Sequence, residues 1–552
     1  MTTTSALCGA LLAAYLASRV YNIWNAQLNN DRRIPRLITP FQILSMIGAI
    51  LPKSPFFRRF AFPWDERDSL YKNANLKTVV AIPLFYGRDV LYTSSLAVFH
   101  QAVGLHGPAQ KSDMSILKIL GENVVTAEGD TWKRHRRITA PAFNHSTYRN
   151  VWETTEKVYA DMLQNEGWVN MNQTPVADFN KITHKLALFI VSIVGFNIPM
   201  SWSEPPRDEK GQLSVQAMIF EVASSIMPRS QIPKWCYYLG IDKLKAIDEA
   251  YCKFEVFMHE RIAEREAHLS KIRATEGTKE ADVSESIKDI FGRLVNARIS
   301  EGKLSLSDEE IIGNCFIFAF AGHETTANTL SMALSLLALY PDKQEWVYNT
   351  IKSAIGDRSP TFEDYDNLTG VLACFYEALR LYPAAYTMIR ITAQDCIFSI
   401  PRRDDPDTIE RISVKKGTPL YLDIVGMLYD PQTFPDPESF IPDRWTDSLS
   451  PGESNSPSIT KDTAANEVSA SSPASSLEGF VGFSFGPRTC LGHKFAKVEA
   501  VAFLTLLLRE WRVEVVLRDG ETKEEWKARV LNPSLRVSMT VKEVPLKLVR
   551  RK

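Results

Sequence analysis

The chain has 552 residues, of which 45% are apolar and 23% charged, and its 64 Lys and Arg nearly balance its 65 Asp and Glu. This composition is that of an ordinary globular protein and excludes a disordered chain, a collagen-like repeat and a polytopic membrane protein. The balanced charge gives no electrostatic footprint for nucleic acid. Seven cysteines without a CxxC pair exclude a disulfide framework and a zinc cluster, so we expect a reducing compartment.

Residues 1–30 are predicted to anchor the chain in a membrane. They hold one charged side chain, Arg19, and the apolar run from Ala6 to Trp24 approaches the roughly 20 residues that span a bilayer. Basic residues follow this run: Arg32, Arg33 and Arg36. Since no basic residue precedes it, the positive-inside rule places the rest of the chain in the cytosol. A cleaved secretory signal is the alternative, and the missing basic segment ahead of the run argues against it.

A second apolar stretch, Leu37–Leu51, carries no charged side chain. It is short for a membrane span and contains Pro40 and Gly48, which interrupt regular structure. We therefore expect an interfacial or re-entrant patch there, with Arg58 and Arg59 close to the lipid headgroups.

The rest of the chain is predicted to be mainly α-helical with small β-sheets. Residues 78–82 and 89–93 flank a turn at Gly87 and indicate a β-hairpin. From about residue 112 to residue 440 the pattern is mostly helical. Two charged amphipathic stretches stand out in it: 151–163 and 243–268.

Two polar segments interrupt this pattern. Residues 270–305 are predicted to be a loop that flanks a short helix. Residues 446–479 are rich in Ser, Pro and Ala, cannot bury a core and are expected to form a disordered insert. Near the end of the chain, apolar and polar residues alternate over 512–517 and 536–549, which indicates strands.

A long central helix is predicted from Ser307 to Tyr340. Ser307 and Glu310 form a capping box at its start, and Pro341 ends it. A helix of this length spans about 50 Å. Because it is apolar on most faces, we expect it to pass through the centre of the fold rather than along its surface.

The segment Phe483–Gly492 reads FSFGPRTCLG and matches the pattern FxxGxRxCxG. Through this loop the chain resembles the cytochrome P-450 superfamily, the haem-thiolate monooxygenases, as a membrane-anchored microsomal type found in fungi. The resemblance implies the fold of that family, with a long central helix and a cysteine-ligand loop. It also implies a haem b cofactor and electrons from NADPH through a flavoprotein reductase.

Each fixed position of this loop has a role in the resembling family. Cys490 is expected to be the axial thiolate on the iron, near a helix N-terminus that stabilises its charge. Arg488 would bind a haem propionate, and Phe483 would shield the sulfur from water. Gly486 permits a tight turn, and Gly492 lets the helix approach the porphyrin. The other six cysteines are interpreted as small buried hydrophobic residues.

The central helix carries a local conflict with helix propensity, Ala321-Gly322-His323-Glu324-Thr325. The resemblance implies that Ala321 and Gly322 leave room for dioxygen and that the helix opens locally. It assigns Thr325 as the alcohol that assists dioxygen activation and Glu324 as the acid that delivers protons. The plain alternative for a Glu-Thr pair is an exposed polar helix face, and His323 is interpreted as a helix neighbour rather than a ligand.

A structural network is predicted from Glu377 and Arg380, which lie three residues apart on one helix face. Alone, such a pair is a common surface ion pair. The segment Pro442–Trp445 resembles the PxRx segment of the family, so Arg444 would complete a buried Glu–Arg–Arg network. We assign this network to fold integrity and haem incorporation rather than to catalysis.

Trp132 and Arg136 form the WxxxR motif of the family, and both would reach a haem propionate, as would Arg390. The motifs occur in the family's order over residues 132–492. The resemblance therefore predicts a haem-binding catalytic domain over 31–552 behind the anchor.

Five basic residues near these motifs are a candidate docking patch for an acidic electron donor. They are Lys133, Arg134, Arg137, Lys494 and Lys497. The alternative for each is ordinary solvated charge.

The expected substrate pocket combines apolar side chains with one or two hydroxyls, which favours a lipophilic substrate such as a terpenoid, sterol or aromatic compound. The resemblance places these residues there: Phe320, Ala321, Thr325, Tyr386, Thr387, Met388 and the segment 112–125. We predict a monooxygenase of secondary metabolism, held in the endoplasmic reticulum membrane with its body in the cytosol.

Three other functions remain open at this point. One is xenobiotic detoxification by the same chemistry. Another is a haem-thiolate isomerase or dehydratase, and those relatives commonly lack the acid–alcohol pair that this chain has at Glu324 and Thr325. The third is a non-catalytic haem sensor or membrane scaffold, which would need no proton relay.

Overall fold

The computed structural model describes residues 2–551 apart from 30, 32, 43–61, 68, 208, 210, 275–286, 288, 303–304 and 450–478. These residues form two compact units, which we call the sheet unit and the helical unit. The sheet unit comprises described residues of 1–112, 385–439 and 457–489, and the helical unit those of 113–384, 440–456 and 490–552. The predicted insert lies outside the described residues except at its ends, as do Arg32, Arg58 and Arg59.

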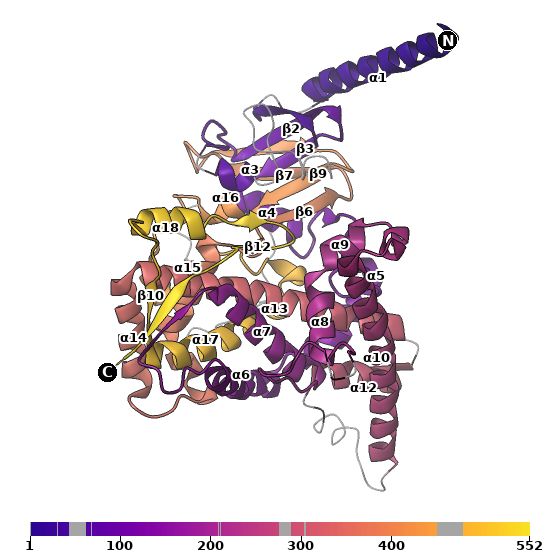
Figure 1. Cartoon of the computed structure of the whole chain (residues 1–552). Coiled ribbons are helices and arrows are strands. Elements are labelled where there is room, and N and C mark those ends of the chain that lie inside the picture. The colour runs from indigo at the N-terminus through magenta and orange to yellow at the C-terminus, as the bar shows by residue number, and fades with distance from the viewer. Residues whose placement is uncertain are drawn as a thin grey trace. The chain divides into compact units, whose positions relative to one another are not determined.

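The sheet unit is built on a sheet of six described strands in the order β1-β2-β3-β9-β6-β4. Its strands are β1 (Arg36–Phe41), β2 (Thr78–Tyr86), β3 (Val90–Thr93), β4 (Ala109–Lys111), β6 (Thr387–Thr392) and β9 (Pro419–Asp423). β2 and β3 form an antiparallel hairpin, and β3 pairs with β9 in parallel. Segments more than 300 residues apart in the sequence therefore lie side by side (Figure 1).

Smaller elements complete this unit. They are α1 (Thr2–Asn29), α3 (Phe62–Asp65), α4 (Leu96–Val103), β7 (Cys396–Pro401), β8 (Ile409–Val414), α16 (Ile424–Leu428) and η8 (Gly486–Arg488). Strand β2 is buried from Thr78 to Pro83 and exposed at Leu84, Phe85 and Tyr86. The predicted hairpin is present, and Gly87 takes a φ of +118° at its turn.

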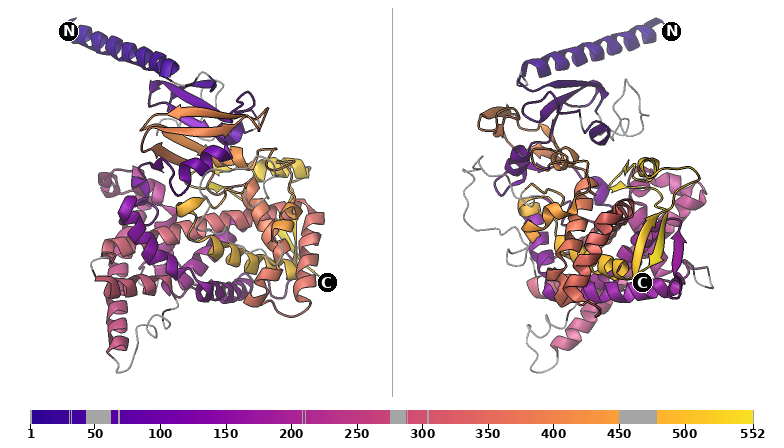
Figure 2. Two further views of the ribbon diagram at one scale, coloured as in Figure 1. Left: turned by 180° about the vertical axis from the view of Figure 1, so that it is seen from behind. Right: turned by 90° about the vertical axis from the view of Figure 1, so that its left-hand side faces the viewer.

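The helical unit is organised around α13 (Asp308–Leu339), which is buried along most of its length. It packs against α7 (Phe179–Phe196), α15 (Thr369–Leu381) and α17 (His493–Glu510), as the views from behind and from the side also show (Figure 2). The predicted boundaries agree with this helix, because Ser307 caps it with Glu310 and Pro341 begins the next helix.

The other elements of the helical unit surround this centre. The helices are α5 (Gly129–Thr139), α6 (His145–Asn165), α8 (Val215–Ser224), α9 (Ile226–Gln231), α10 (Asp242–Arg273), α12 (Ile290–Glu301), α14 (Pro341–Ile355) and α18 (Lys523–Val530). The strands are β5 (Gln173–Val176), β10 (Trp511–Val515), β11 (Ser534–Leu535), β12 (Met539–Thr540) and β13 (Leu546–Arg550). Short 3₁₀ turns are η1 (Ser115–Leu117), η2 (Ala140–Ala142), η3 (Lys234–Tyr238), η5 (Phe362–Asn367), η6 (Pro442–Trp445) and η7 (Asp447–Leu449).

The structure differs from the sequence-based prediction in two places. The stretch predicted to be mostly helical contains the strands β6 to β9 between residues 387 and 423. Their short runs carry mixed apolar and polar residues, and pairing makes them strands: β9 pairs with β3, β6 pairs with β4 and β9, and β7 and β8 pair with each other. The stretch predicted as an interfacial patch begins with β1, which pairs with β2, and its remainder from residue 43 lies outside the described residues.

Among the described residues, one helix is long and apolar enough to cross a membrane, and it is α7. Since 72% of that helix is buried inside the protein, it is a core helix. The apolar part of α1, Ala6–Tyr21, is shorter. Its described large apolar side chains are exposed, among them Leu7, Leu11 and Val20.

Candidate active site

The residues predicted for the site occur in both units, and we describe each unit by itself. In the sheet unit, the loop before the cysteine makes a tight turn. Gly486 has a φ of +69°, and an added Cβ there would lie 2.6 Å from the Val103 carbonyl oxygen. A larger residue at 486 would therefore clash with the backbone at the end of α4. Arg488 ends the 3₁₀ turn that Gly486 begins.

Cys490 belongs to the helical unit and lies three residues before α17 begins. Burial raises the pKa of its thiol, whereas the backbone N–H of Gly492 and the positive charge of Arg136 lower it. The residue nevertheless keeps accessible surface. This thiol is therefore partly desolvated, keeps some accessible surface and has a cation near it. A cysteine in such surroundings can act as a thiolate ligand of a bound group.

Arg136 on α5 is close enough to this thiol for the two charges to affect each other's pKa. Burial lowers the pKa of the Arg136 guanidinium, and the charge of Cys490 raises it. Trp132 lies one turn earlier on the same helix and is partly buried. The two residues of the WxxxR motif are thus about one turn apart along α5.

The surroundings of Cys490 in the helical unit are compatible with a bound haem. Gly492 has no atom within 4 Å of the place that a Cβ would take, so the start of α17 is open at that point. A thiolate donor, a neighbouring guanidinium and an open glycine fit the ligand set of a haem-thiolate site.

On α13, Thr325 donates its hydroxyl hydrogen to the Ala321 carbonyl oxygen at 2.8 Å. The helix is continuous from Asp308 to Leu339, so the local opening that we expected is replaced by this side-chain bond within a regular helix. Gly322 faces α7, where an added Cβ would lie 3.0 Å from Val191 Cγ2. The absence of a side chain at 322 thus allows close packing of two helices.

Glu324 is partly buried, and burial raises the pKa of its carboxyl. The Ser538 hydroxyl donates to Glu324 Oε1 at 2.8 Å, and this bond and the charge of Arg536 lower the same pKa. His323, the preceding residue, is buried with its Nδ1 2.9 Å from the Ala319 carbonyl oxygen, and burial lowers its pKa to about 3. It is a neutral helix neighbour, as interpreted from the sequence.

The structure brings Glu377, Arg380 and Arg444 together. Glu377 is fully buried and accepts from Arg380 at 2.9 and 3.0 Å and from Arg444 Nε at 3.2 Å. The Glu377 carboxylate accepts two further hydrogen bonds, from the Trp445 indole N–H at 2.8 Å and from the Ile441 amide at 3.0 Å. No sequence motif marks these two donors, although Trp445 directly follows Arg444.

Four of the remaining predicted residues lie on β6 or just before it, in the sheet unit. Arg390 is buried and donates to the Ile389 carbonyl oxygen at 2.9 Å. Tyr386 is also buried, and burial raises the pKa of its phenol. Thr387 donates to the Leu422 carbonyl oxygen at 3.3 Å, and Met388 is partly buried.

The last two predicted residues are phenylalanines. Phe483, in the sheet unit, contacts the ring of Phe480. Phe320, in the helical unit, is buried on α13.

The predicted basic patch is wrong for one of its members. Lys497 is buried beside the Tyr376 hydroxyl, and burial lowers its pKa to about 8. Arg134 is partly exposed and is paired with Glu310. Lys494 is partly buried over the Tyr365 ring, while Lys133 is exposed.

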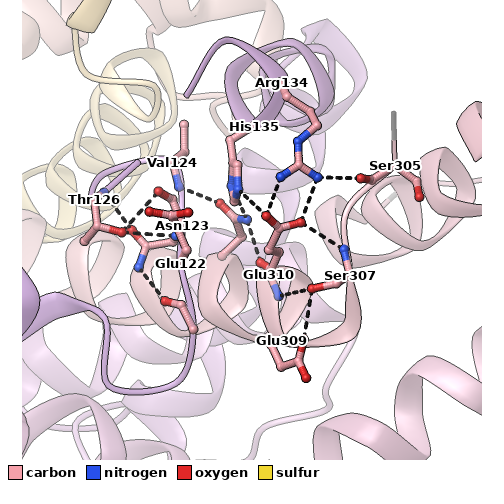
Figure 3. Close-up of polar contacts among 12 residues, drawn as sticks. Glu122, Asn123, Val124, Thr126, Arg134, His135, Ser305, Ser307, Glu309 and Glu310 are labelled. Carbon is pink, nitrogen blue, oxygen red and sulfur yellow. Dashed lines mark hydrogen bonds and ion pairs between the residues drawn. The ribbon is translucent and has the colours of Figure 1, made fainter. Parts of the chain in front are cut away.

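Arg134 belongs to a polar cluster that joins α5 to the start of α13 (Figure 3). Glu310 accepts from Arg134 at 2.9 Å and from the Ser307 amide at 3.0 Å, and lies 3.3 Å from His135 Nε2. Asn314, one turn further, contacts His135 Nδ1 and accepts from the Val124 amide, both at 2.9 Å. Because Arg134 and His135 lie between Trp132 and Arg136, this cluster fixes the helix that carries the WxxxR motif.

The chain belongs to the cytochrome P450 family, whose family model matches residues 84–541. It is 31% identical over 453 residues to cytochrome P450 monooxygenase 124 of Postia placenta, which covers 80% of this chain and 79% of the relative. It is 27% identical to cytochrome P450 monooxygenase prx9 of Penicillium rubens, over 79% of this chain and 74% of the relative. With cytochrome P450 4F12 of Homo sapiens it shares 28% identity, over 71% of this chain and 68% of the relative.

Family membership confirms the predicted fold class and enzyme class. The protein is a P450 monooxygenase, an oxidoreductase that uses dioxygen. Its cofactor is the haem-thiolate iron of the family, and NADPH acting through a reductase is the family's standard electron source.

Proposed function

We propose that this P450 hydroxylates a lipophilic substrate of secondary metabolism, such as a terpenoid, with electrons supplied by an NADPH-dependent flavoprotein reductase. The observation that carries the proposal is the pair Glu324 and Thr325 on the buried helix α13. Dioxygen cleavage consumes protons and needs groups that deliver them, whereas a haem-thiolate enzyme that rearranges or dehydrates its substrate without dioxygen does not have this need. The similarity to monooxygenases of Postia placenta and Penicillium rubens supports the monooxygenase reaction.

The haem would be held through Cys490, with Arg136, Trp132, Arg488 and Arg390 as the candidates for its propionates. When bound, this cofactor supplies the activation of dioxygen. The cation of Arg136 and the N–H of Gly492 both favour the thiolate form of Cys490.

Glu324 and Thr325 would supply the protons that the reaction consumes. Burial raises the pKa of Glu324, so its carboxyl keeps a proton to a higher pH than an exposed glutamate does. The Thr325 hydroxyl hydrogen is directed at Ala321, which leaves the lone pairs of the oxygen available as acceptors. In a site that excludes water, such groups are needed to move protons from solvent.

The proposal is tested by oxygenation in the presence of NADPH and reductase, with a panel of terpenoids, sterols and aromatic compounds. Comparison of metabolites between a host that expresses the chain and one that does not identifies the substrate. We expect a product that carries one oxygen atom from ¹⁸O₂. An isomerised or dehydrated product without label would contradict the proposal.

Substitution of Thr325 by Ala is expected to uncouple the reaction. Haem binding and the carbon-monoxide spectrum should remain, because the hydroxyl is bonded only within α13. Product formation should fall by about 100-fold or less, since a placed proton donor contributes 10²–10⁴-fold and water partly replaces it. NADPH consumption should fall less, with the difference released as hydrogen peroxide. If peroxide per NADPH is unchanged while both rates fall together, Thr325 is only a packing residue.

We further propose that α1 anchors the protein in the endoplasmic reticulum membrane with its body in the cytosol. Exposed apolar side chains of α1, such as Leu11 and Leu16, support this, and so do Phe85 and Tyr86 at the end of β2 in the same unit. An exposed apolar surface of this kind is costly in water.

Deletion of residues 1–30 is therefore expected to move part of the protein from the microsomal to the soluble fraction. Release should be incomplete if the end of β2 also contacts lipid. In sealed microsomes, added protease should digest the body of the full-length protein. Protection of the body would contradict this topology.

A further inference from the structure

Ser538 is the hydrogen-bond partner of Glu324, although 214 residues separate them in the sequence. Ser538 is 3% exposed and lies in the short turn between β11 and β12. The turn is held by the pairing of β11 with β12 and by a bond of 3.0 Å from the Met539 amide to the Ala384 carbonyl oxygen. Its backbone therefore fixes where the Ser538 hydroxyl can point.

The direction of the Ser538 hydroxyl is set by Asn328, one turn after Glu324 on α13. The Asn328 side-chain N–H₂ donates to the Ser538 oxygen at 3.2 Å. Asn328 Oδ1 accepts from the Thr540 hydroxyl at 2.8 Å and lies 3.2 Å from His184 Nε2. Because burial lowers the pKa of His184, its ring is neutral and can donate one N–H. Two donors on Oδ1 thus fix which way the amide points.

The Ser538 hydroxyl is a donor and an acceptor at once. A hydroxyl has one hydrogen and two lone pairs. The Ser538 hydrogen is donated to Glu324 Oε1, and one lone pair of its oxygen accepts from Asn328. A protonated Glu324 then carries its own hydrogen on Oε2, the oxygen that can pass it on.

We propose that Ser538, oriented by Asn328, is a positioning residue that holds Glu324 so that Oε2 carries the transferable proton. This inference rests on the proposed role of Glu324 in proton delivery. The other charged group that acts on Glu324 is Arg536 in the same turn, which favours the carboxylate as Ser538 does. Removing the Ser538 hydroxyl should therefore raise the pKa of Glu324 and let its side chain rotate.

The test compares Ser538→Ala with Ser538→Thr, which keeps the hydroxyl. Ser335→Ala is the matched control. Ser335 lies about three turns after Glu324 on α13, is also buried, and donates its hydroxyl hydrogen to the Ser331 carbonyl oxygen of the same helix. In the haem-loaded enzyme with reductase, Ser538→Ala should raise hydrogen peroxide formed per product by about 2- to 10-fold, the range expected for one lost hydrogen bond. Ser538→Thr and Ser335→Ala should stay near the original ratio.

The pH profile separates positioning from mere stability. The fraction of NADPH consumption that yields product should fall as pH rises through the pKa of Glu324. This fall should occur at higher pH in Ser538→Ala. Asn328→Asp should shift the loss in the same direction, since a second carboxylate disfavours the charged form of Glu324. An unshifted profile in both variants overturns the inference.

A readout independent of activity is the coupling between the two side chains in denaturant unfolding. Ser538→Ala should lower the folding equilibrium constant by about 2- to 10-fold in the original chain and much less in a chain that carries Glu324→Ala. Equal losses in both chains overturn the inference.

Glu324→Gln separates this inference from the proposed function. If Glu324→Gln raises the peroxide ratio and Ser538→Ala does not, only the role of Ser538 fails. If Glu324→Gln leaves the ratio unchanged, the proposed role of Glu324 fails, and with it the role of Ser538.

Discussion

Replacing Cys490 by Ala should abolish both activity and the strongly red-shifted Soret band that the ferrous carbon-monoxide complex shows with a thiolate ligand. The methyl group of the alanine cannot replace this donor, because it has no electron pair to give to iron. The neighbouring cation Arg136 would remain and would lose the thiolate charge that it faces. The expected loss is complete rather than graded, since ligation is present or absent.

The control for this experiment is Cys252→Ala, which removes an exposed thiol on α10. That variant should keep the full carbon-monoxide band and full activity. A red-shifted band that survives in Cys490→Ala would show that another group ligates the iron, and the assignment of the loop would be wrong.

Replacing Glu377 by Ala should have the largest effect on stability. Arg380 is fully buried and would lose the carboxylate that holds it, while Arg444, Trp445 and the Ile441 amide would lose the same acceptor. Removing one partner of a buried ion pair costs about 3–5 kcal/mol. That is a large part of the roughly 5–15 kcal/mol that stabilises a folded protein. We therefore expect little folded, haem-containing protein at ordinary temperature.

A surface ion pair of the same type is the matched control. Glu363 pairs with Arg149, and both side chains are about half exposed. Glu363→Ala should leave the midpoint of unfolding nearly unchanged, because water screens such a pair. Both variants are compared by haem content per protein and by the midpoint of denaturant unfolding. If Glu377→Ala unfolds at the same midpoint as Glu363→Ala, the network does not stabilise the fold.

The parts of this fold that could be predicted are those with local signals. The ends of α13 were predictable because its cap, Ser307 with Glu310, and its stop, Pro341, lie within the segment itself. The same holds for Gly486, whose positive φ follows from a short motif. The strands β6 and β9 were not predictable, because pairing with β4 and β3, which lie about 300 residues earlier in the sequence, stabilises them and no local periodicity reveals it.

The candidate site divides in the same way. Glu324, Thr325 and Cys490 were identified from short motifs. Ser538 has no motif, since only the folded chain brings it to Glu324. Lys497 was assigned to a surface because lysine is rarely buried, yet its position on α17 faces the interior. Sequence motifs therefore identified residues by their type and spacing. Which residues surround them depends on three-dimensional packing, which no local pattern contains.

The double use of Glu310 has a consequence for how the length of this chain can change. The same carboxylate caps α13 and binds α5, so it serves as a common reference point for both helices. A residue inserted between Glu310 and Thr325 would turn the later part of α13 by about 100° relative to that point. A residue inserted before Ser307 would leave the register of α13 unchanged. Length variation among related chains should therefore collect upstream of the cap, and the spacing from Glu310 to Thr325 should be constant.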